Sequence, residues 1–315
     1  MTQATASFLS TQLLQLTLLF LFGYLCWLKQ FRRPLAVFLC LGCFLAAAGC
    51  FVTDLQTKYV DQKEQKRIEA IPEGAQIQFQ DVDAWTFPDT PDPLLSDHPH
   101  AIAAWVLTTV RTDPDGPVQQ TFPKTAWEDV TAASNSLCAQ LSIDTVFQTV
   151  TATNPDGILQ PDTSANIAMT IVIDPQQIRK DTKTALQVRR LAGDALSQAG
   201  ITETMTEKEA VLAILSWVCD HMTYDDAGGD AITGFTEGTG NCNTYALLIR
   251  AMCKEAGIRC TYQPGEADNG TGFGPHAWNQ IWIDETPYWL DAGWVDDGNL
   301  TYCLSKTLWP DHRIT

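Results

Sequence analysis

Positive charge is scarce in this chain of 315 residues, which has 20 Lys and Arg against 37 Asp and Glu and a net charge of −17. Residues 1–53 contain three of the basic residues, Lys29, Arg32 and Arg33, and no acidic residue, so the remainder carries −20. Such an acidic surface repels phosphate groups, which argues against nucleic acid or anionic lipid as a ligand of this remainder. We interpret it as a solubilising surface.

Charged side chains are missing from two long runs near the N-terminus, Phe8–Leu28 and Leu35–Val52. Each run is close to the length of about 20 residues that a helix needs to cross a bilayer. A short basic segment, Lys29–Pro34, joins them and belongs on the cytoplasmic side of a membrane. The sequence therefore predicts two transmembrane helices within residues 1–53, with the rest of the chain outside the cytoplasm.

A bacterial lipoprotein signal is the alternative interpretation of the same region. Arg32 and Arg33 precede an apolar run that ends in Leu-Ala-Ala-Ala-Gly-Cys, which makes Cys50 the candidate for lipidation. The match is imperfect, because Ala47 stands where Leu is usual and the upstream apolar run is foreign to such a signal. Both interpretations anchor residues 1–53 and place the remainder outside.

Internal repeats and chemical motifs are both absent from residues 54–203. Residues 54–99 are predicted to be a juxtamembrane stalk, charged and helix-permissive over Asp54–Gly74, and a loop at Phe87–His100. Residues 100–203 are predicted to be an accessory α+β region that acts as a scaffold or positions a substrate. The expected elements are strands at His100–Val110, Thr145–Thr153 and Ala165–Ile173, helices at Ala126–Leu141 and Lys183–Ala199, and turns at Pro155–Gly157 and Pro161–Asp162.

Cys242 stands at the predicted start of a buried helix. Two glycines precede it, and Asn241 and Asn243 beside it are residues that commonly cap helix N-termini. Apolar residues then recur at three- and four-residue spacing, and Gly257 follows where a left-handed C-terminal cap belongs. The helix dipole and the unpaired N–H groups of the first turn favour a thiolate and can receive a developing oxyanion. The position therefore suits a cysteine nucleophile.

His276 and Asp291 lie on two strand-like runs, His276–Ile283 and Pro287–Trp294. If a two-residue Asp-Glu turn joins the runs, Asp291 faces Trp278 and is a diagonal neighbour of His276. Diagonal neighbours on antiparallel strands are about 7–8 Å apart, so the carboxylate can hold one ring nitrogen while the other faces the thiol. A four-residue turn would displace the pair, and Asp-Glu is not a favoured hairpin turn.

Three separated motifs surround these residues in a fixed order. They are Gly240-x-Cys242-x-x-Tyr245-Ala246, His276-Ala-Trp-Asn and the Trp-Leu-Asp that ends at Asp291, preceded by the helix-like run Glu207–Asp226. Together, over roughly residues 204–297, they resemble the core of the transglutaminase-like superfamily. The resemblance implies an α+β, papain-like fold for residues 204–315, with Cys242 as nucleophile, His276 as general base and acid, Asp291 as orienter, and no cofactor.

The resemblance leaves two classes of function open, because the superfamily includes transamidases, proteases, amidases and inactive binding proteins. The first is a membrane-anchored, extracytoplasmic cysteine enzyme that acts on amide bonds of a protein or cell-wall peptide through a thioester. The alternative is a catalytically silent binding or scaffold module. In papain-like enzymes a side chain upstream of the cysteine is the second oxyanion donor, but no Gln stands close before Cys242. Tyr224 and Trp217 are the nearby candidates for this role.

Metal binding is not favoured. Zinc sites usually contain a second close pair of Cys or His ligands, and the sequence offers no such pair to accompany Cys242, His276 and Asp291. The Cys40-x-x-Cys43 spacing lies in an apolar run, where cysteines act as soft hydrophobes. Six cysteines follow residue 53, and with Cys242 free the remaining five cannot all pair in disulfides.

Overall fold

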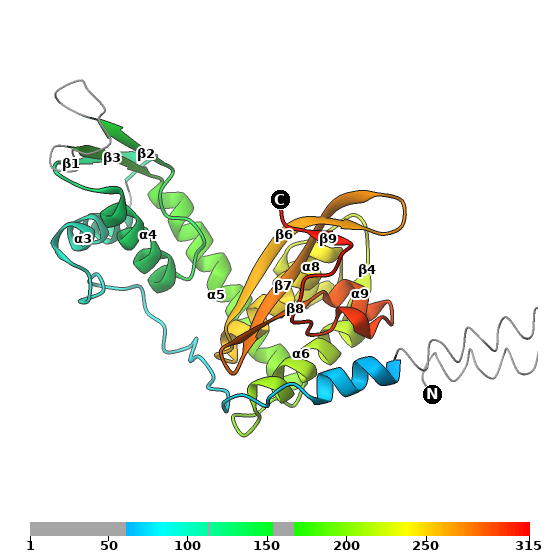
Figure 1. The fold of residues 1–315 in the computed structure, drawn as a ribbon. Helices are drawn as coiled ribbons and strands as arrows, with labels where there is room; N and C mark the ends of the chain where they lie inside the picture. The colour runs from blue at the N-terminus through cyan, green and yellow to red at the C-terminus, as the bar shows by residue number, and fades with distance from the viewer. Residues whose placement is uncertain (1–60, 113, 154–166) are drawn as a thin grey trace, which may run out of the picture. The chain divides into compact units, whose positions relative to one another are not determined.

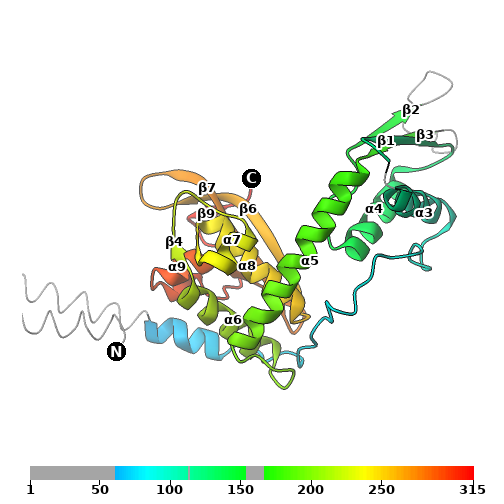
Figure 2. The ribbon, with the colours of Figure 1, turned by 180° about the vertical axis from the view of Figure 1, so that it is seen from behind.

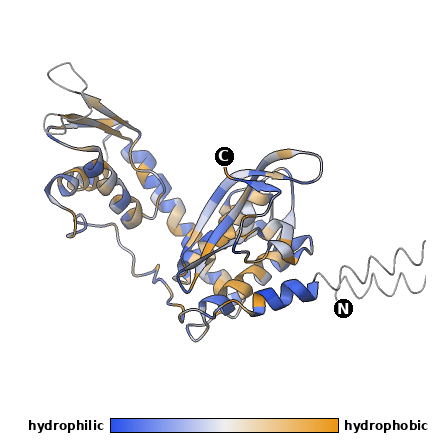
Figure 3. Ribbon diagram, viewed as in Figure 1, coloured by the Kyte–Doolittle hydropathy of each residue, from blue (hydrophilic) through white to orange (hydrophobic). Residues whose placement is uncertain are grey.

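The computed structural model describes residues 61–112, 114–153 and 167–315 (Figure 1). The chain divides into two compact units, residues 1–70 and 71–315. Within the first unit, residues 61–69 form a mostly hydrophilic helix (Figure 3), in the segment for which a stalk is predicted. No helix within the described ranges is both long and apolar enough to cross a membrane. The two charge-free N-terminal runs, Cys50 and both turns predicted between residues 154 and 166 lie outside those ranges.

Residues 71–315 form an α+β unit with antiparallel sheets (Figures 1 and 2). Its first elements are α3 (Asp97–Thr112), β1 (Val118–Phe122), α4 (Trp127–Leu141), β2 (Thr149–Thr153), β3 (Ala168–Ile173) and α5 (Pro175–Gln198). The following elements are α6 (Glu207–His221), β4 (Thr223–Tyr224), α7 (Ala231–Glu237), β5 (Thr239–Gly240), α8 (Cys242–Glu255), β6 (Cys260–Asp268), β7 (Phe273–Ile283), β8 (Thr286–Leu290), α9 (Ala292–Asp296), the 3-10 helix η2 (Leu300–Tyr302) and β9 (His312–Arg313).

A three-stranded antiparallel sheet in the order β1-β3-β2 organises the accessory region. One face of β3 is buried through Met169, Ile171 and Ile173, in a cluster that also contains the apolar faces of α3 and α4. The helix predicted at Ala126–Leu141 is confirmed as α4, and the two predicted strands that bracket residues 154–166 are confirmed in shorter form as β2 and β3. Strand β1 was not predicted.

The strand predicted at His100–Val110 is wrong, because this segment lies in helix α3. Its β-branched and aromatic residues suggest a strand, yet Ile102, Val106 and Val110 are buried at four-residue spacing, which is the period of a helix face. Asp97 in the first turn complements the helix dipole. The helix also begins three residues before the end of the predicted loop.

Helix α5 begins eight residues before the predicted start at Lys183. Asp174 accepts hydrogen bonds from the backbone N–H groups of Gln176 and Gln177, and Pro175 occupies the first helical position, where its missing N–H costs nothing. The Asp-Pro pair is a start signal that the sequence interpretation overlooked. In the structure α5 packs against both α3 and α8.

A second antiparallel sheet, in the order β8-β7-β6-β9, carries α8 on it. Helix α8 also packs against α5, α6 and α7, and its residues Leu248, Ile249, Met252 and Cys253 have no solvent-exposed surface. The predicted helix start at Cys242 is confirmed. The left-handed backbone at Gly257, with φ of 73°, is confirmed as well.

The predicted hairpin register is confirmed: β7 and β8 pair with Ile283 opposite Thr286. Asp284 and Glu285 form the turn with φ of 51° and 58°, the left-handed values that a type I′ turn requires at both positions. The strand predicted to run to Trp294 instead ends at Leu290, because the Asp291 side chain accepts from the backbone N–H of Trp294 and caps helix α9.

Candidate active site

Cys242 occupies the first position of α8, directly after the short strand β5. The Asn241 side chain accepts from the backbone N–H of Asn243 at 3.1 Å and so fixes the helix start. Gly240 is required immediately before this turn, because a Cβ there would approach the Cβ of Thr244 to 2.4 Å. The thiol is half-buried and free.

His276 and Asp291 are joined by a hydrogen bond. The Nε2–H group of His276 donates to Asp291 Oδ2 at 2.7 Å, and the two side chains are 9% and 1% exposed. Because Nε2 is engaged in this bond, Nδ1 of the same ring remains for the Cys242 thiol, with which His276 also interacts. The structure therefore brings together all three residues that the sequence singles out.

The electrostatics of the pair favour the charged forms of both groups. Burial raises the pKa of Cys242, but hydrogen bonding and Coulomb attraction to His276, with backbone N–H groups of Ala277 and Asn243, outweigh it and lower the pKa. Burial lowers the pKa of His276, whereas its bonds to Asp291 and Cys242 raise that pKa to about 9. Both shifts in pKa are in the direction that favours a thiolate–imidazolium pair over the neutral thiol and imidazole.

The Asp291 carboxylate remains ionised although it is almost completely buried. Burial raises the pKa of Asp291, but hydrogen bonds from His276 and His312 outweigh this effect and lower it. His312 is a site neighbour that sequence reasoning missed. It comes from β9, which pairs with β6, and its Nε2 lies 3.2 Å from Asp291 Oδ2.

Two tyrosines lie close to Cys242. Tyr224, on β4, is half-exposed, and its hydroxyl interacts with the backbone N–H and the thiol of Cys242. Tyr262, on β6, donates its hydroxyl to Asn243 Oδ1 at 2.8 Å. Trp217, the second sequence candidate for an oxyanion donor, instead stacks on His221 with ring centroids 4.3 Å apart.

A metal ion is not needed to explain the grouping of His276, Asp291 and His312. Their potential ligand atoms lie within 4.8 Å of one another, but hydrogen bonds of 2.7 and 3.2 Å already join them. The group does not contain Cys242, so the zinc set considered from the sequence is not the one that the fold assembles.

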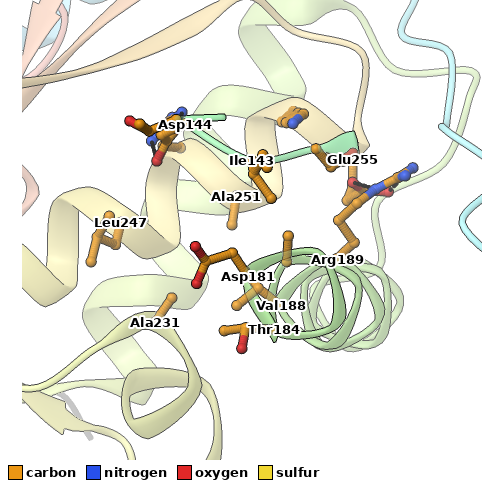
Figure 4. Close-up of a pocket in the computed structure, with 15 residues that line it drawn as sticks. Ile143, Asp144, Asp181, Thr184, Val188, Arg189, Ala231, Leu247, Ala251 and Glu255 are labelled. Carbon is orange, nitrogen blue, oxygen red and sulfur yellow. Dashed lines mark hydrogen bonds and ion pairs between the residues drawn. The ribbon is translucent and has the colours of Figure 1, made fainter. Parts of the chain in front are cut away.

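A separate cavity of about 430 Å³ lies between α5, α8 and residues 142–145 (Figure 4). Its opposite sides are held by two ion pairs, Arg189 with Glu255 at 2.6 Å and Arg250 with Asp144 at 2.6 Å. None of the three candidate active-site residues lines it, and its two arginines are paired with carboxylates. We regard it as packing between the accessory region and the core rather than as the reaction site.

Known proteins resemble part of this chain. The family model described as Transglutaminase-like superfamily matches residues 194–296. Human Kyphoscoliosis peptidase is 32% identical over 142 residues, which cover 39% of this chain and 21% of that protein. The mouse Kyphoscoliosis peptidase is 31% identical over 111 residues, which cover 30% of this chain and 17% of that protein. The chain thus spans about a fifth of the length of these relatives.

Among solved structures, one described as a candidate cysteine protease from Cytophaga hutchinsonii aligns with 14% identity and a TM-score of 0.30, over 57% of this chain and 68% of that one. A TM-score this low does not establish a common fold. The family match rests instead on the sequence of residues 194–296, which contain helix α8 and the β7–β8 hairpin. Residues 194–296, with Cys242, His276 and Asp291 among them, thus belong to the transglutaminase-like superfamily.

Proposed function

We propose that residues 204–315 form a cysteine enzyme that cleaves or transfers amide bonds of a peptide or protein through a thioester on Cys242. The observation that carries the proposal is the buried hydrogen bond from His276 to Asp291, with the Cys242 thiol interacting with the same imidazole. A half-buried thiol at a helix N-terminus and paired with an imidazolium is in the state that nucleophilic attack requires. A binding module has no need of such a pair.

The acylation step follows from the protonation states of the pair. The Cys242 thiolate attacks the amide carbon, a C–S bond forms, and the carbonyl oxygen becomes an oxyanion. The His276 imidazolium then gives its proton to the nitrogen as the C–N bond breaks, so the amine leaves neutral and a thioester remains. Asp291 keeps the imidazole ring in the orientation and tautomer that this transfer needs.

The second step returns the enzyme to its starting state. Water or a second amine gives a proton to neutral His276 as it attacks the thioester carbon, and Cys242 leaves as thiolate. Hydrolysis and transamidation differ only in this acceptor. The name of the curated relatives supports peptide hydrolysis, and we propose it as the main reaction.

The oxyanion requires two donors beside the scissile carbonyl. We propose the backbone N–H of Cys242 and the hydroxyl of Tyr224 for this role. In the free protein these two groups interact with each other, so a substrate carbonyl oxygen that enters between them would receive both hydrogen bonds.

Alkylation of Cys242 by iodoacetamide tests the proposed pair. Free cysteine has a pKa of about 8.5, and helix N-termini or a nearby imidazolium lower it to about 3.5–7.5. We therefore expect rapid modification of Cys242 already near pH 6, with little further acceleration up to pH 9, because the thiolate is already formed. His276→Ala removes the imidazolium, and we expect the profile to move to higher pH while the helix contribution remains. Peptide mapping by mass spectrometry provides the measurement.

Cys253 is the internal control, because it lies on the same helix with no exposed surface and should be modified only after unfolding. If Cys242 instead follows the profile of a model thiol in both proteins, the pair is not assembled and the binding-module alternative replaces the enzyme.

We propose further that residues 1–53 anchor the chain in a membrane and that residues 54–315 lie on the extracytoplasmic side. The two charge-free runs and the basic segment Lys29–Pro34 support this orientation. A protease added to sealed, right-side-out vesicles that carry the full chain is expected to digest residues 54–315. Digestion only after lysis of the vesicles would reverse the assignment.

A further inference from the structure

His312 is buried beside His276 and Asp291, although its position in the sequence does not indicate this. Strand β9 has only two residues and pairs with β6, so that His312 lies opposite Ala267. The imidazole has no exposed surface. Three tryptophan rings surround it, with centroids 4.6 to 4.9 Å from its own; they are those of Trp278, Trp294 and Trp309.

Both ring nitrogens of His312 face carboxylates. Nδ1 lies 2.8 Å from Asp311 Oδ1, and Nε2 lies 3.2 Å from Asp291 Oδ2. An ionised carboxylate only accepts hydrogen bonds, so the Nε2–H group of His312 donates to Asp291. Asp311 is held in turn by the Tyr302 hydroxyl, which donates to its Oδ2 at 2.6 Å.

The Asp291 carboxylate is consequently held by three donors from three different parts of the fold. His276 on β7 and His312 on β9 both donate to Oδ2, and the backbone N–H of Trp294 in α9 donates to Oδ1 at 3.3 Å. Two of these contacts fix the rotation of the carboxylate independently of His276. The oxygen that receives His276 is therefore placed by contacts other than that of His276 itself.

We propose that His312 is a positioning residue of this site, which holds the Asp291 carboxylate toward His276 through the chain Asp311–His312–Asp291–His276. The proposal rests on the proposed function only for its consequence in turnover. This row of hydrogen bonds also predicts how the Cys242 thiol titrates, which can be measured without a substrate. It also assigns a role in the site to the C-terminal segment, which lies beyond the residues that the family model matches.

The effect of His312 on the thiol runs through charge as well as position. The titratable groups that face His312 are His276, Asp291, Asp311 and Tyr302. His312 gives the buried Asp291 carboxylate a second hydrogen bond, at the same oxygen that receives His276. Without it, Asp291 takes up a proton more readily, holds the His276 imidazolium less firmly, and so stabilises the Cys242 thiolate less.

His312→Phe in the full chain is the direct test, because phenylalanine fills the same space between the tryptophan rings but cannot donate. We expect the pH profile of Cys242 alkylation by iodoacetamide to move to higher pH, in the same direction as in His276→Ala but by less. His312→Gln retains a donor that can reach Asp291 and is expected to restore part of the shift. Asp311→Asn changes a partly exposed residue, retains an acceptor for Nδ1 and is expected to give a smaller shift.

Ile281→Ala is the matched control. Ile281 is fully buried on β7, the strand that carries His276, and has no part in the hydrogen-bonded chain. Its loss lowers the thermal midpoint but should leave the alkylation profile in place. A wild-type profile in His312→Phe, or an equal shift in Ile281→Ala at matched folded fraction, would overturn the positioning role. Dependence of the wild-type profile on EDTA or added Zn²⁺ that His312→Phe abolishes would replace it with a metal site.

These outcomes separate the two proposals. Failure of the proposed function appears in the wild type, where Cys242 would already behave as a model thiol. Failure of the role of His312 leaves the wild-type profile perturbed and the His312→Phe profile identical to it. If His312→Phe does not fold, the Asp311→Asn profile decides, and no shift in that variant counts against the chain.

Discussion

Replacement of Cys242 by alanine is expected to abolish turnover of a peptide amide. Removal of the nucleophile of a comparable triad in a serine protease lowers kcat by about 10⁶-fold. We expect a loss of more than about 10⁴-fold here, because residual catalysis would have to come from substrate binding and the oxyanion donors alone. The thiol is only half-buried, so the fold should tolerate the smaller methyl group. Initial rates on a peptide library, with thermal unfolding of both proteins, provide the measurement.

Cys260→Ala is the control for this substitution. Cys260 is another partly exposed thiol and begins β6, away from the helix start that carries Cys242. Its loss should leave turnover unchanged. If Cys242→Ala keeps the wild-type rate, the reaction does not use this thiol and the mechanism proposed here is wrong.

The sequence was sufficient to predict the geometry of the pair because local rules govern it. Side chains of a strand alternate with a period of two, so a two-residue turn fixes which residues of β7 and β8 face each other. The same argument holds for Cys242, since an Asn cap and a regular apolar spacing define the start of a helix. The sequence therefore predicts that His276 and Asp291 are neighbours, and in the structure His276 Nε2 lies 2.7 Å from Asp291 Oδ2.

His312 could not be found in this way. It reaches Asp291 through a two-residue strand that pairs with β6, more than forty positions earlier in the chain, and such a short pairing has no periodic signal. Its neighbours Trp309 and Asp311 suggest nothing until the C-terminal segment is placed. The position of Tyr224 beside Cys242 depends likewise on the β4–β5 pair, in which Tyr224 lies opposite Gly240.

The error at α3 has a different physical origin. Its residues have the composition of a strand, and tertiary packing against α4 and α5 decides for a helix. Local propensity is a weak guide where an element is stabilised mainly by the face that it buries. This error did not arise around the candidate active site, because caps and turns, rather than composition, mark its elements.

The Asp291→Asn variant is expected to lose both activity and stability. In a serine protease the corresponding change leaves the geometry intact but lowers kcat about 10⁴-fold, because the wrong imidazole tautomer is favoured. We expect a loss of similar size in turnover. From the sequence alone, the fold of the Asp291→Asn variant is expected to be nearly intact. The structure changes this expectation, because Asp291 is 1% exposed and accepts hydrogen bonds from two histidines and a backbone N–H group.

An asparagine cannot satisfy those three donors. Its amide has one acceptor oxygen, and its NH₂ group would face an N–H group of either a histidine or the α9 backbone. Breaking a buried ion pair by removing one partner costs about 3–5 kcal/mol, and we expect a loss of that order in the free energy of unfolding. Asp296→Asn, five residues along the chain, is the matched control, since the Tyr245 hydroxyl that donates to Asp296 Oδ2 can donate equally to an amide oxygen.

The pH dependence of stability identifies the cause. The pKa of His276 is raised to about 9 in the folded protein, from about 6.5 for a free imidazole, so its contribution is fully present below pH 6.5 and is lost as the pH rises through about 9. The bond to Asp291 is the largest of the effects that raise this pKa, so the loss between pH 6.5 and 9 should be much smaller in Asp291→Asn. The contribution of Asp291 to stability has the opposite pH dependence, because folding lowers its pKa. This contribution is present above about pH 3.9 and is lost as the pH falls through the pKa of Asp291 in the folded protein. Urea unfolding across this range is the measurement. An Asn variant with wild-type turnover and a wild-type stability profile would reduce Asp291 to the helix cap of α9.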